Sequence, residues 1–466
     1  MTPTGWLVTA ATVALVAALP YWLPTAVIAL RVRIFAWVGG EEGIRAPGRE
    51  VPAEEFKQVY GHPAANGRSR GAALSDLFWY WLSPGPEVHQ EHLEPGPRYD
   101  DVARSTRQIL AGLSREQWTE LVGRCTRRVL DELAGEPSAR VRTVRLRDLM
   151  TPVWAEVYYE VVFREPCPRH ARELIVGNAD DVVSALKCTR LRHMDRRARL
   201  TAYLRDRLAH DPPSVPLPSS LTQREQAYYL QGTFFNTAVV QMSEAMAHLL
   251  LALATHRPVQ DRLLAGEEDP DFLDRVINET LQHFPLFGVA HRITSDDIPR
   301  PGRDPIPAGS VLLFNYPEYQ GSGRGRFDPD RWLSADTRPA ASIPFGVTAN
   351  RPCPARGFAV LTMRIAAEET LRRFGLESSA EHTRSLPSRG PCLLLPRTGA
   401  APRRPARRWI RLTAMRLGDR WTGVWRSLVQ LVLGSYMVWD ARRQGLCRNH
   451  FAASSGGSAP SVAAGR

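Results

Sequence analysis

The stretch IPFGVTANRPCPARGFAV, residues 343–360, carries Cys353 in a segment that is rich in glycine and proline. These residues bend a chain sharply, so that backbone N–H groups can point at a cysteine sulfur. Arg351 precedes the cysteine, and a helix is predicted to follow it from Phe358; a nearby cation and a helix N-terminus both favour a thiolate. A lone cysteine is usually a small buried hydrophobic residue. The flanking glycines, prolines and Arg351 instead favour a thiolate at Cys353.

The stretch resembles the haem-ligand loop of the cytochrome P-450 family, whose pattern is F-G-x-G-x-R-x-C-x-G-x-x-F/L-A. The positions that match in type are Phe345, Gly346, Arg351, Cys353, Phe358 and Ala359. The chain departs from the pattern by one extra residue between Phe345 and Cys353, by Thr348 in place of the second glycine, and by Ala355 in place of the glycine after the cysteine. The resemblance implies that Cys353 ligates the iron of haem b (iron protoporphyrin IX) and that Phe345 and Arg351 contact this cofactor.

A second resemblance lies upstream of the cysteine loop. The strings INETLQHFPLFGVAHRITSDDI, IPAGSVLLFNYPEY and RFDPDRWL look like the family's K-helix, the two short strands after it and the meander. In that pattern an E-x-x-R helix motif and a meander arginine form a buried charge network. Glu279 and Arg331 are present here, whereas Gln282 replaces the helix arginine. We expect Glu279 to pair with Arg331, and the neutral Gln282 to hydrogen-bond to either, in a weakened network.

Arginines are the expected partners of the haem propionates, because a guanidinium binds a carboxylate through two parallel hydrogen bonds. Arg292, in a predicted strand, stands where the family places such an arginine. Arg104 and Arg107 stand at the C-helix position, on a helix predicted over residues 100–113, and are further candidates. The alternative for these two is a solvated helix face, which is the commoner role of a charged run.

The side of the haem away from the cysteine matches the family less well. The family's A-G-x-E/D-T-T stretch falls on TAVVQM, residues 237–242. Val240 and Gln241 replace the acid and the alcohol that deliver protons. We assign Gln241 to the catalytic site as a hydrogen-bond donor, although an amide does not shuttle protons. Ser243 and Glu244 follow within one helical turn and are expected to face another helix.

The resemblance covers about residues 99–400 and implies a mainly α fold with a small β-sheet component. It implies monooxygenation of an apolar small molecule, with electrons supplied by a ferredoxin or a flavoprotein reductase. The missing acid–alcohol pair and the altered cysteine loop leave two alternatives open. One is an oxygen-independent haem-thiolate isomerase, dehydratase or peroxygenase, and the other is a membrane haem protein or scaffold without turnover.

The net charge of +12 is concentrated near the C-terminus, where twelve arginines and two aspartates lie between Arg397 and His450. The rest of the chain is nearly neutral, which argues against nucleic-acid binding. Basic residues are almost all arginine, a usage typical of GC-rich bacterial genomes. The six cysteines are widely spaced, which excludes the usual zinc patterns and a disulfide framework and favours a reducing, cytoplasmic compartment.

The first thirty residues contain no charged side chain and are long enough to cross a bilayer as a helix. They lack the basic start and cleavage site of a signal peptide. Arg31 and Arg33 follow directly, which predicts a membrane anchor with the main domain on the cytoplasmic side. Pro20 and Pro24 would kink such a helix, so shallow monotopic insertion is the alternative.

The remaining sequence predicts the organisation of the chain. We expect five parts: an anchor (1–33), a divergent region without recognisable strands (34–98), a haem-thiolate core (99–400), a basic amphipathic extension (401–450) and a disordered tail (451–466). Predicted core helices cover residues 100–113, 114–135 with Ser114 as N-cap, 144–163 and 180–210, the last with His193 and Met194 on its surface. The extension combines tryptophans with arginines and predicts a helix in the membrane interface; docking onto the protein itself is the alternative.

Overall fold

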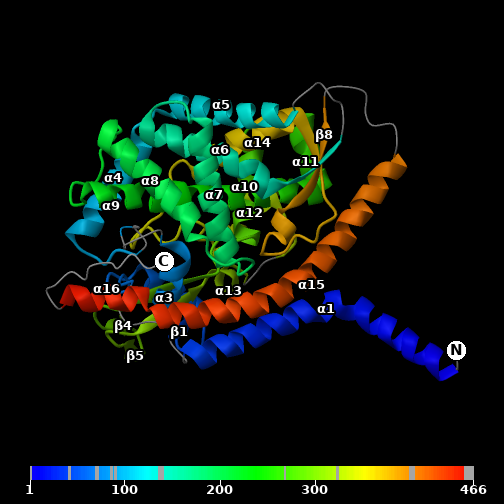
Figure 1. Cartoon of the computed structure of the whole chain (residues 1–466), viewed down its shortest axis with the longest axis horizontal. Coiled ribbons are helices and arrows are strands. Elements are labelled where there is room, and N and C mark those ends of the chain that lie inside the picture. Colours follow the sequence, from blue (N-terminus) through cyan, green and yellow to red (C-terminus); the bar gives the residue numbers. More distant parts are fainter. Residues whose placement is uncertain are drawn as a thin grey trace.

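The computed structural model describes residues 3–39, 43–68, 73–83, 88, 92–134, 141–266, 269–321, 325–397 and 405–455. The fold is mainly helical with three small sheets, as predicted (Figure 1). The helical body consists of α4 (Pro97–Ala111), α5 (Arg115–Ala134), α6 (Leu146–Phe163), α7 (Arg169–Leu186), α8 (Met194–His210), α9 (Gln223–Leu230), α10 (Val239–Thr255), α11 (Arg257–Ala265), α12 (Phe272–His283), α13 (Tyr316–Gly321) and α14 (Ala359–Arg373).

Helix α10 is the core helix of the body and lies among α6, α7 and α12 (Figure 1). Its sequence is apolar on nearly every side, and fourteen of its residues are buried, because a helix without a polar face is stable only inside the protein. Together with α9 and the π-helix η2 (Gln231–Ala238) it forms one apolar stretch that is long enough to cross a membrane, but that is mostly buried in the body.

The predicted helices of the core are largely confirmed, and Ser114 caps α5 by accepting a hydrogen bond from the Gln117 backbone N–H at 3.2 Å. The continuous helix expected over residues 180–210 is wrong, because α7 ends at Leu186 and α8 begins at Met194. Buried Asp181 explains this break: its carboxylate accepts hydrogen bonds from the His193 backbone N–H (2.8 Å) and from Arg197 Nε (2.7 Å). His193 and Met194 lie at the exposed start of α8, as predicted for a surface position.

The sheets are short. One consists of β1 (Ile44–Ala46), β6 (Val311–Asn315) and β3 (Val289–Ile293); the second of β2 (Arg142–Arg145), β8 (Pro391–Pro396) and β7 (Phe374–Glu377); the third of β4 (Ile298–Arg300) and β5 (Arg303–Ile306).

The expectation that region 34–98 holds no strand is wrong for β1, which is too short for an alternating pattern to be visible. Residues 144 and 145, predicted as helix, belong to β2. Short helices complete the body: η1 (Ala53–Glu55), α2 (Phe56–Gly61), η3 (Pro329–Trp332) and η4 (Pro387–Arg389).

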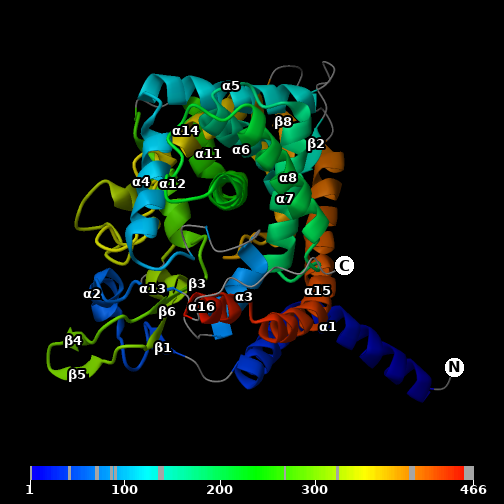
Figure 2. The same ribbon diagram turned by 60° about the vertical axis from the view of Figure 1, so that its left-hand side comes forward.

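Four helices lie along one side of the body (Figures 1 and 2). They are α1 (Pro3–Gly39), α3 (Ala73–Leu82), α15 (Pro405–Gln444) and α16 (Leu446–Ser455). The C-terminal extension thus docks onto the protein: Met437 and Ala441 of α15 are fully buried, and Tyr80 of α3 donates a hydrogen bond to Asp440 at 2.9 Å. Residues 451–455, expected to be disordered, complete α16, and residues 456–466 lie outside the described residues.

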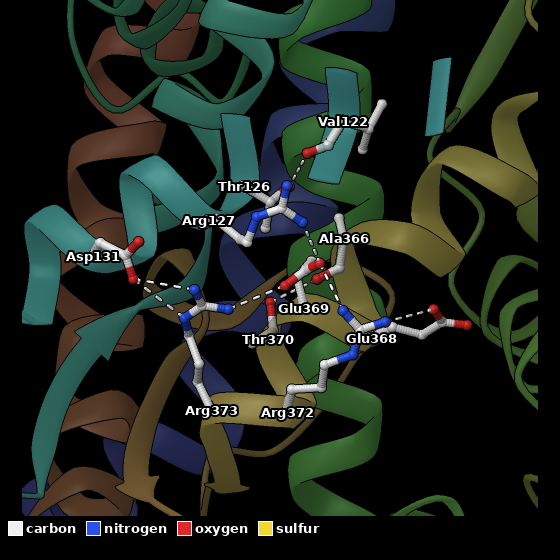
Figure 3. A network of polar contacts seen from close by, with 10 residues as sticks. All are labelled: Val122, Thr126, Arg127, Asp131, Ala366, Glu368, Glu369, Thr370, Arg372 and Arg373. Carbon is white, nitrogen blue, oxygen red and sulfur yellow. Dashed lines mark hydrogen bonds and ion pairs between the residues drawn. The ribbon is translucent and has the colours of Figure 1, made fainter. Parts of the chain in front are cut away.

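A buried carboxylate connects α14, the helix that follows the cysteine loop, to α5 (Figure 3). Glu369 binds three arginines, with contacts of 2.8 Å to Arg127 Nη1, 2.7 Å to Arg372 Nη1 and 3.0 Å to Arg373 Nη1. Its side chain is 5% exposed, so the arginines and not water compensate its charge.

Replacing Glu369 by glutamine is expected to lower the free energy of unfolding by about 2–4 kcal/mol, because three clustered guanidinium groups would lose their common counter-charge. The neighbouring Glu368, which is 40% exposed and binds Arg364 and Arg372 at the surface, provides the matched control. Glu368→Gln should cost under about 1 kcal/mol. Chemical denaturation of both variants measures this difference, and equal losses would contradict the assigned role of Glu369.

Candidate functional site

The cysteine loop between η3 and α14 is closed by its own backbone. The Cys353 N–H donates to the carbonyl oxygen of Phe345 at 3.3 Å, and the chain turns through Gly346 (φ 72°) and Arg351 (φ 49°). A Cβ at position 346 would lie 3.4 Å from the Tyr60 hydroxyl and would require a left-handed backbone, so glycine fits this position best. The loop therefore accommodates its extra residue and keeps Phe345 next to the cysteine.

Asn350 attaches the enlarged loop to the N-terminal region. Its Nδ2 lies 3.2, 3.0 and 2.8 Å from the carbonyl oxygens of Tyr60, His62 and Ala65. The side chain is 6% exposed, so these contacts replace water as its partners. Asn350 could not be predicted from the sequence, because an asparagine next to an insertion gives no signal of what it will contact.

Cys353 lines a cavity whose empty space, about 1290 Å³, includes open solvent at its mouth. Four other residues that were predicted for the haem site also line this cavity: Gln241, Arg292, Phe345 and Arg351. Most of its wall is apolar, with Leu110, Phe234, Met242, Leu286, Phe287 and Met363 among the lining residues. The cavity thus brings together side chains from η2, α10, β3 and the cysteine loop.

Three arginines lie on the cavity wall. Arg292 is 1% exposed and donates to the Tyr60 hydroxyl at 3.1 Å, which in turn lies 2.6 Å from the Tyr316 hydroxyl. Arg351 donates to the Leu93 carbonyl oxygen at 2.6 Å. Arg68, which sequence analysis missed, donates to the His291 carbonyl oxygen at 2.9 Å. Its position in a divergent region, without a motif, offered no sequence signal.

Arg104 and Arg107, predicted as further propionate partners, are not among the residues that line the cavity. Both side chains are exposed on α4, and Arg104 pairs with Asp101 at 3.5 Å. The helical phase explains this outcome, because Thr106 and Leu110 occupy the face of α4 that lines the cavity. The two arginines lie on the solvated face.

Part of the cavity wall is built by η2 and the start of α10. Thr233, Thr237 and Gln241 line the cavity at intervals of four residues. π-helical segments often mark functional sites, because they change the phase at which side chains leave a helix. Gln241 makes no hydrogen bond within the described part of the chain, so its amide can serve a molecule in the cavity.

Ser243 and Glu244 face away from the cavity, as expected. Ser243 donates to the Val239 carbonyl oxygen at 2.6 Å. Glu244 contacts Arg147 of α6 at 2.8 Å and Lys187 at 2.9 Å. Burial alone would raise the pKa of Glu244, but the two cations outweigh burial and lower it to about 2. Glu244 is thus a structural carboxylate.

Glu279 of α12 is fully buried and receives four contacts. Arg331 Nε lies 2.7 Å away, Trp332 Nε1 2.9 Å, the Asp328 backbone N–H 2.7 Å, and His283 Nε2 3.0 Å. The expected pairing with Arg331 is thus present.

Gln282 does not hydrogen-bond to Glu279 or Arg331, as was predicted, but to Gln320. It donates to the Gln320 carbonyl oxygen at 3.0 Å, and the Gln320 side chain donates back to it at 3.3 Å. His283 joins the Glu279 network instead, one helical turn after the glutamate, with its Nε2 2.9 Å from Arg331 Nη2. The family motif has an i, i+3 spacing and therefore did not predict His283, which lies at i+4 from Glu279.

The cavity fits a haem by the chemistry of its wall. Cys353 offers the sulfur ligand, the apolar side chains suit the porphyrin faces, and Arg68, Arg292 and Arg351 offer cations for two carboxylates. Tyr158 also lines the cavity, and burial, with a smaller effect of nearby Cys353, raises the pKa of its phenol, so it stays protonated.

Comparison with protein families and curated proteins agrees with this site. The family model described as Cytochrome P450 matches residues 218–401. Cytochrome P450 135B1 of Mycobacterium tuberculosis is 30% identical over 207 residues, which cover 41% of this chain and 42% of that protein. Cytochrome P450 3A1 of Rattus norvegicus is 27% identical over 164 residues, which cover 30% and 32% respectively. The matches thus span less than half the length of these relatives.

Solved structures share the fold over most of the chain. Cytochrome P450 OleT in complex with arachidonic acid has a TM-score of 0.60 and 15% identity, and the match covers 75% of this chain and 88% of that chain. The retinoic acid-bound cyanobacterial CYP120A1 has a TM-score of 0.57 and 16% identity, with coverage of 74% and 87%. The cysteine loop, the buried Glu279 and the overall fold are therefore all consistent with the cytochrome P450 family.

Proposed function

Because the chain is a divergent member of the cytochrome P450 family, we propose that it binds haem b through Cys353 and uses it to insert oxygen into an apolar small molecule. The observation that carries this proposal is the opening of Cys353 into a large apolar cavity with arginines on its wall. When bound, the haem supplies an iron centre for oxygen or peroxide chemistry, which a thiolate ligand favours by donating electron density.

Each group of residues has a distinct part in the proposed function. Arg292 would hold a propionate, and its bond to the hydroxyl of Tyr60, which also contacts Tyr316, fixes the guanidinium before the cofactor arrives. Apolar side chains such as Phe234, Leu286 and Phe287 exclude water and accept an apolar substrate. Electrons would come from a ferredoxin or a flavoprotein reductase.

Gln241 supports a second candidate function, because it stands where the family has a proton-delivering residue. The carboxylate nearest to it along α10, Glu244, is held away from the cavity by Arg147 and Lys187. A site without an acid at this position suits a reaction that starts from a peroxide, or an isomerisation or dehydration, because these reactions do not need protons delivered during the activation of molecular oxygen. Two structural neighbours bind arachidonic acid and retinoic acid, so long-chain apolar acids are the first substrates to test.

The carbon monoxide difference spectrum of the reduced protein in detergent tests haem binding and its ligand. We expect the red-shifted Soret band of a thiolate-ligated haem. Turnover that requires NAD(P)H and a reductase would then support the monooxygenase, and turnover with hydrogen peroxide alone would support the second function. A protein that purifies without haem would contradict both and leave a membrane scaffold.

Replacing Gln241 by leucine is expected to lower kcat/KM about tenfold without changing haem content, because one hydrogen bond to a molecule in the cavity is worth about 1 kcal/mol or slightly more. Ser243→Ala on the same helix, which removes a hydroxyl that faces away from the cavity, is the control and should leave kcat/KM unchanged. An equal effect of both changes would show that Gln241 acts only through the stability of α10.

A further inference from the structure

Helix α15 exposes an apolar stripe on the side that faces away from the protein. The members of this outer stripe are Ile410, Leu417, Trp421, Trp425, Leu428, Val432, Tyr436 and Trp439. They recur every three, four or seven residues, so they lie on one face over about 45 Å of helix. The exposed face of a water-soluble helix is normally polar, and a contiguous apolar surface of this length marks a binding surface.

The outer stripe is next to a second exposed apolar surface, that of α1. Residues 6–17 of α1 are exposed on all sides, and both views show this end projecting beyond the body (Figures 1 and 2). The window Trp6–Val38 is long and apolar enough to cross a membrane, and only 6% of it is buried. The helix bends along its length in Figure 1, and Pro20 and Pro24 lie inside it.

Direct contacts fix α1 on α15. Arg420 donates to the Tyr21 hydroxyl at 2.9 Å. Farther along, Gly434 allows a close approach, because a Cβ at that position would meet the Arg31 guanidinium at 3.0 Å. Arg31 also donates to the Cys188 sulfur at 3.3 Å, and Val27 is 4% exposed. These contacts hold α1 and α15 together, so their exposed apolar surfaces belong to one part of the molecule.

We propose that α1 and α15 together form a monotopic membrane-binding face, in which the outer stripe of α15 lies in the interface of a phospholipid bilayer. Tryptophans suit this depth because their rings are apolar and their N–H groups are polar. Exposed Arg411, Arg416 and Arg443 of the same helix suit anionic headgroups. The occupant is a bilayer and not a second copy, because α1, which packs against α15, carries an uncharged end that is exposed on every side and is long and apolar enough to enter a membrane.

Partition of the full-length protein onto phosphatidylcholine vesicles, with and without phosphatidylglycerol, tests the proposal. The variant Trp421→Ser/Trp425→Ser/Val432→Ser keeps α1 and changes only outward side chains. We expect its partition coefficient to fall at least about tenfold, because three large apolar groups no longer enter the bilayer. Wild-type partition should rise with phosphatidylglycerol.

A matched pair of single variants distinguishes the loss of a membrane contact from the general effect of replacing an exposed apolar side chain by a polar one. Trp425 is 67% exposed on the stripe, and Leu333 is 63% exposed on the body. Trp425→Ser should weaken partition, whereas Leu333→Ser should not; thermal unfolding checks that both fold. Unchanged partition of the triple variant would show that α1 alone attaches the protein. A wild-type dimer that the triple variant loses, together with unchanged partition, would identify a second copy as the occupant, and either result overturns the proposal.

Discussion

Replacement of Cys353 by alanine is expected to abolish the thiolate-type Soret band of the reduced carbon monoxide complex and to reduce turnover to background. Cys353 is the one cysteine among the described residues that line the cavity. Four of the others are poor ligands, since burial raises the thiol pKa of Cys125, Cys188 and Cys392 and raises that of Cys167 to about 12. No second sulfur of this kind replaces the missing thiolate.

The control for this experiment is Cys167→Ala. Cys167 is free and half-buried, and it is not among the residues that line the cavity. Its removal should leave the spectrum and the turnover unchanged. A Cys353→Ala protein that keeps the red-shifted band would place the ligand elsewhere, and an unfolded variant would be recognised by its circular dichroism spectrum.

Replacement of Glu279 by glutamine is expected to lower the free energy of unfolding by about 3–5 kcal/mol, because it leaves Arg331 buried without its counter-charge. Glu279 is 0% exposed, and Arg331 is 14% exposed in its side chain, so water compensates little of the loss. Chemical denaturation measures the change. Glu318→Gln, at an exposed carboxylate that binds only Asn315 among the described residues, should cost under about 1 kcal/mol.

The same network predicts a dependence on pH. Burial alone would raise the pKa of Glu279, but the hydrogen bonds from His283, Arg331, the Asp328 backbone and Trp332 outweigh burial and lower it. A carboxyl group with a lowered pKa in the folded state contributes stability above the pKa of the unfolded chain, and this contribution is lost as the pH falls through the folded value. Wild-type stability should therefore decline in acid, and the Glu279→Gln variant should lack this part of the decline. An identical acid profile for both proteins would exclude the role assigned to Glu279.

Local sequence patterns were sufficient to predict the structural elements whose residues are neighbours along the chain. The cysteine loop, the strand with Arg292 and the Ser114 cap could be predicted because their residues follow one another along the chain. Helices with an apolar stripe could be predicted for the same reason. The break between α7 and α8 could not, since Asp181 produces it from twelve residues upstream through the His193 backbone.

The charged residues show most clearly what could not be predicted from the sequence. Arg104, Arg107 and Arg292 are equally suited to bind a carboxylate by their type, but only the helical phase of α4 and the pairing of β3 with β6 decide which of them reaches the cavity. Arg68, Asn350 and His283 likewise acquire their contacts from segments distant in sequence or from a different helical spacing.

The sequence by itself determined the family resemblance, the cysteine in the loop, the predominance of helix and the apolar N-terminal segment, because each of these is written in adjacent residues. Only the tertiary structure decided which arginines line the cavity, that His283 and not Gln282 joins Glu279, and that α15 packs against α1 with its outer stripe exposed. The physical reason is that side-chain partners and solvent exposure depend on how distant segments pack, and packing is a property of the whole chain.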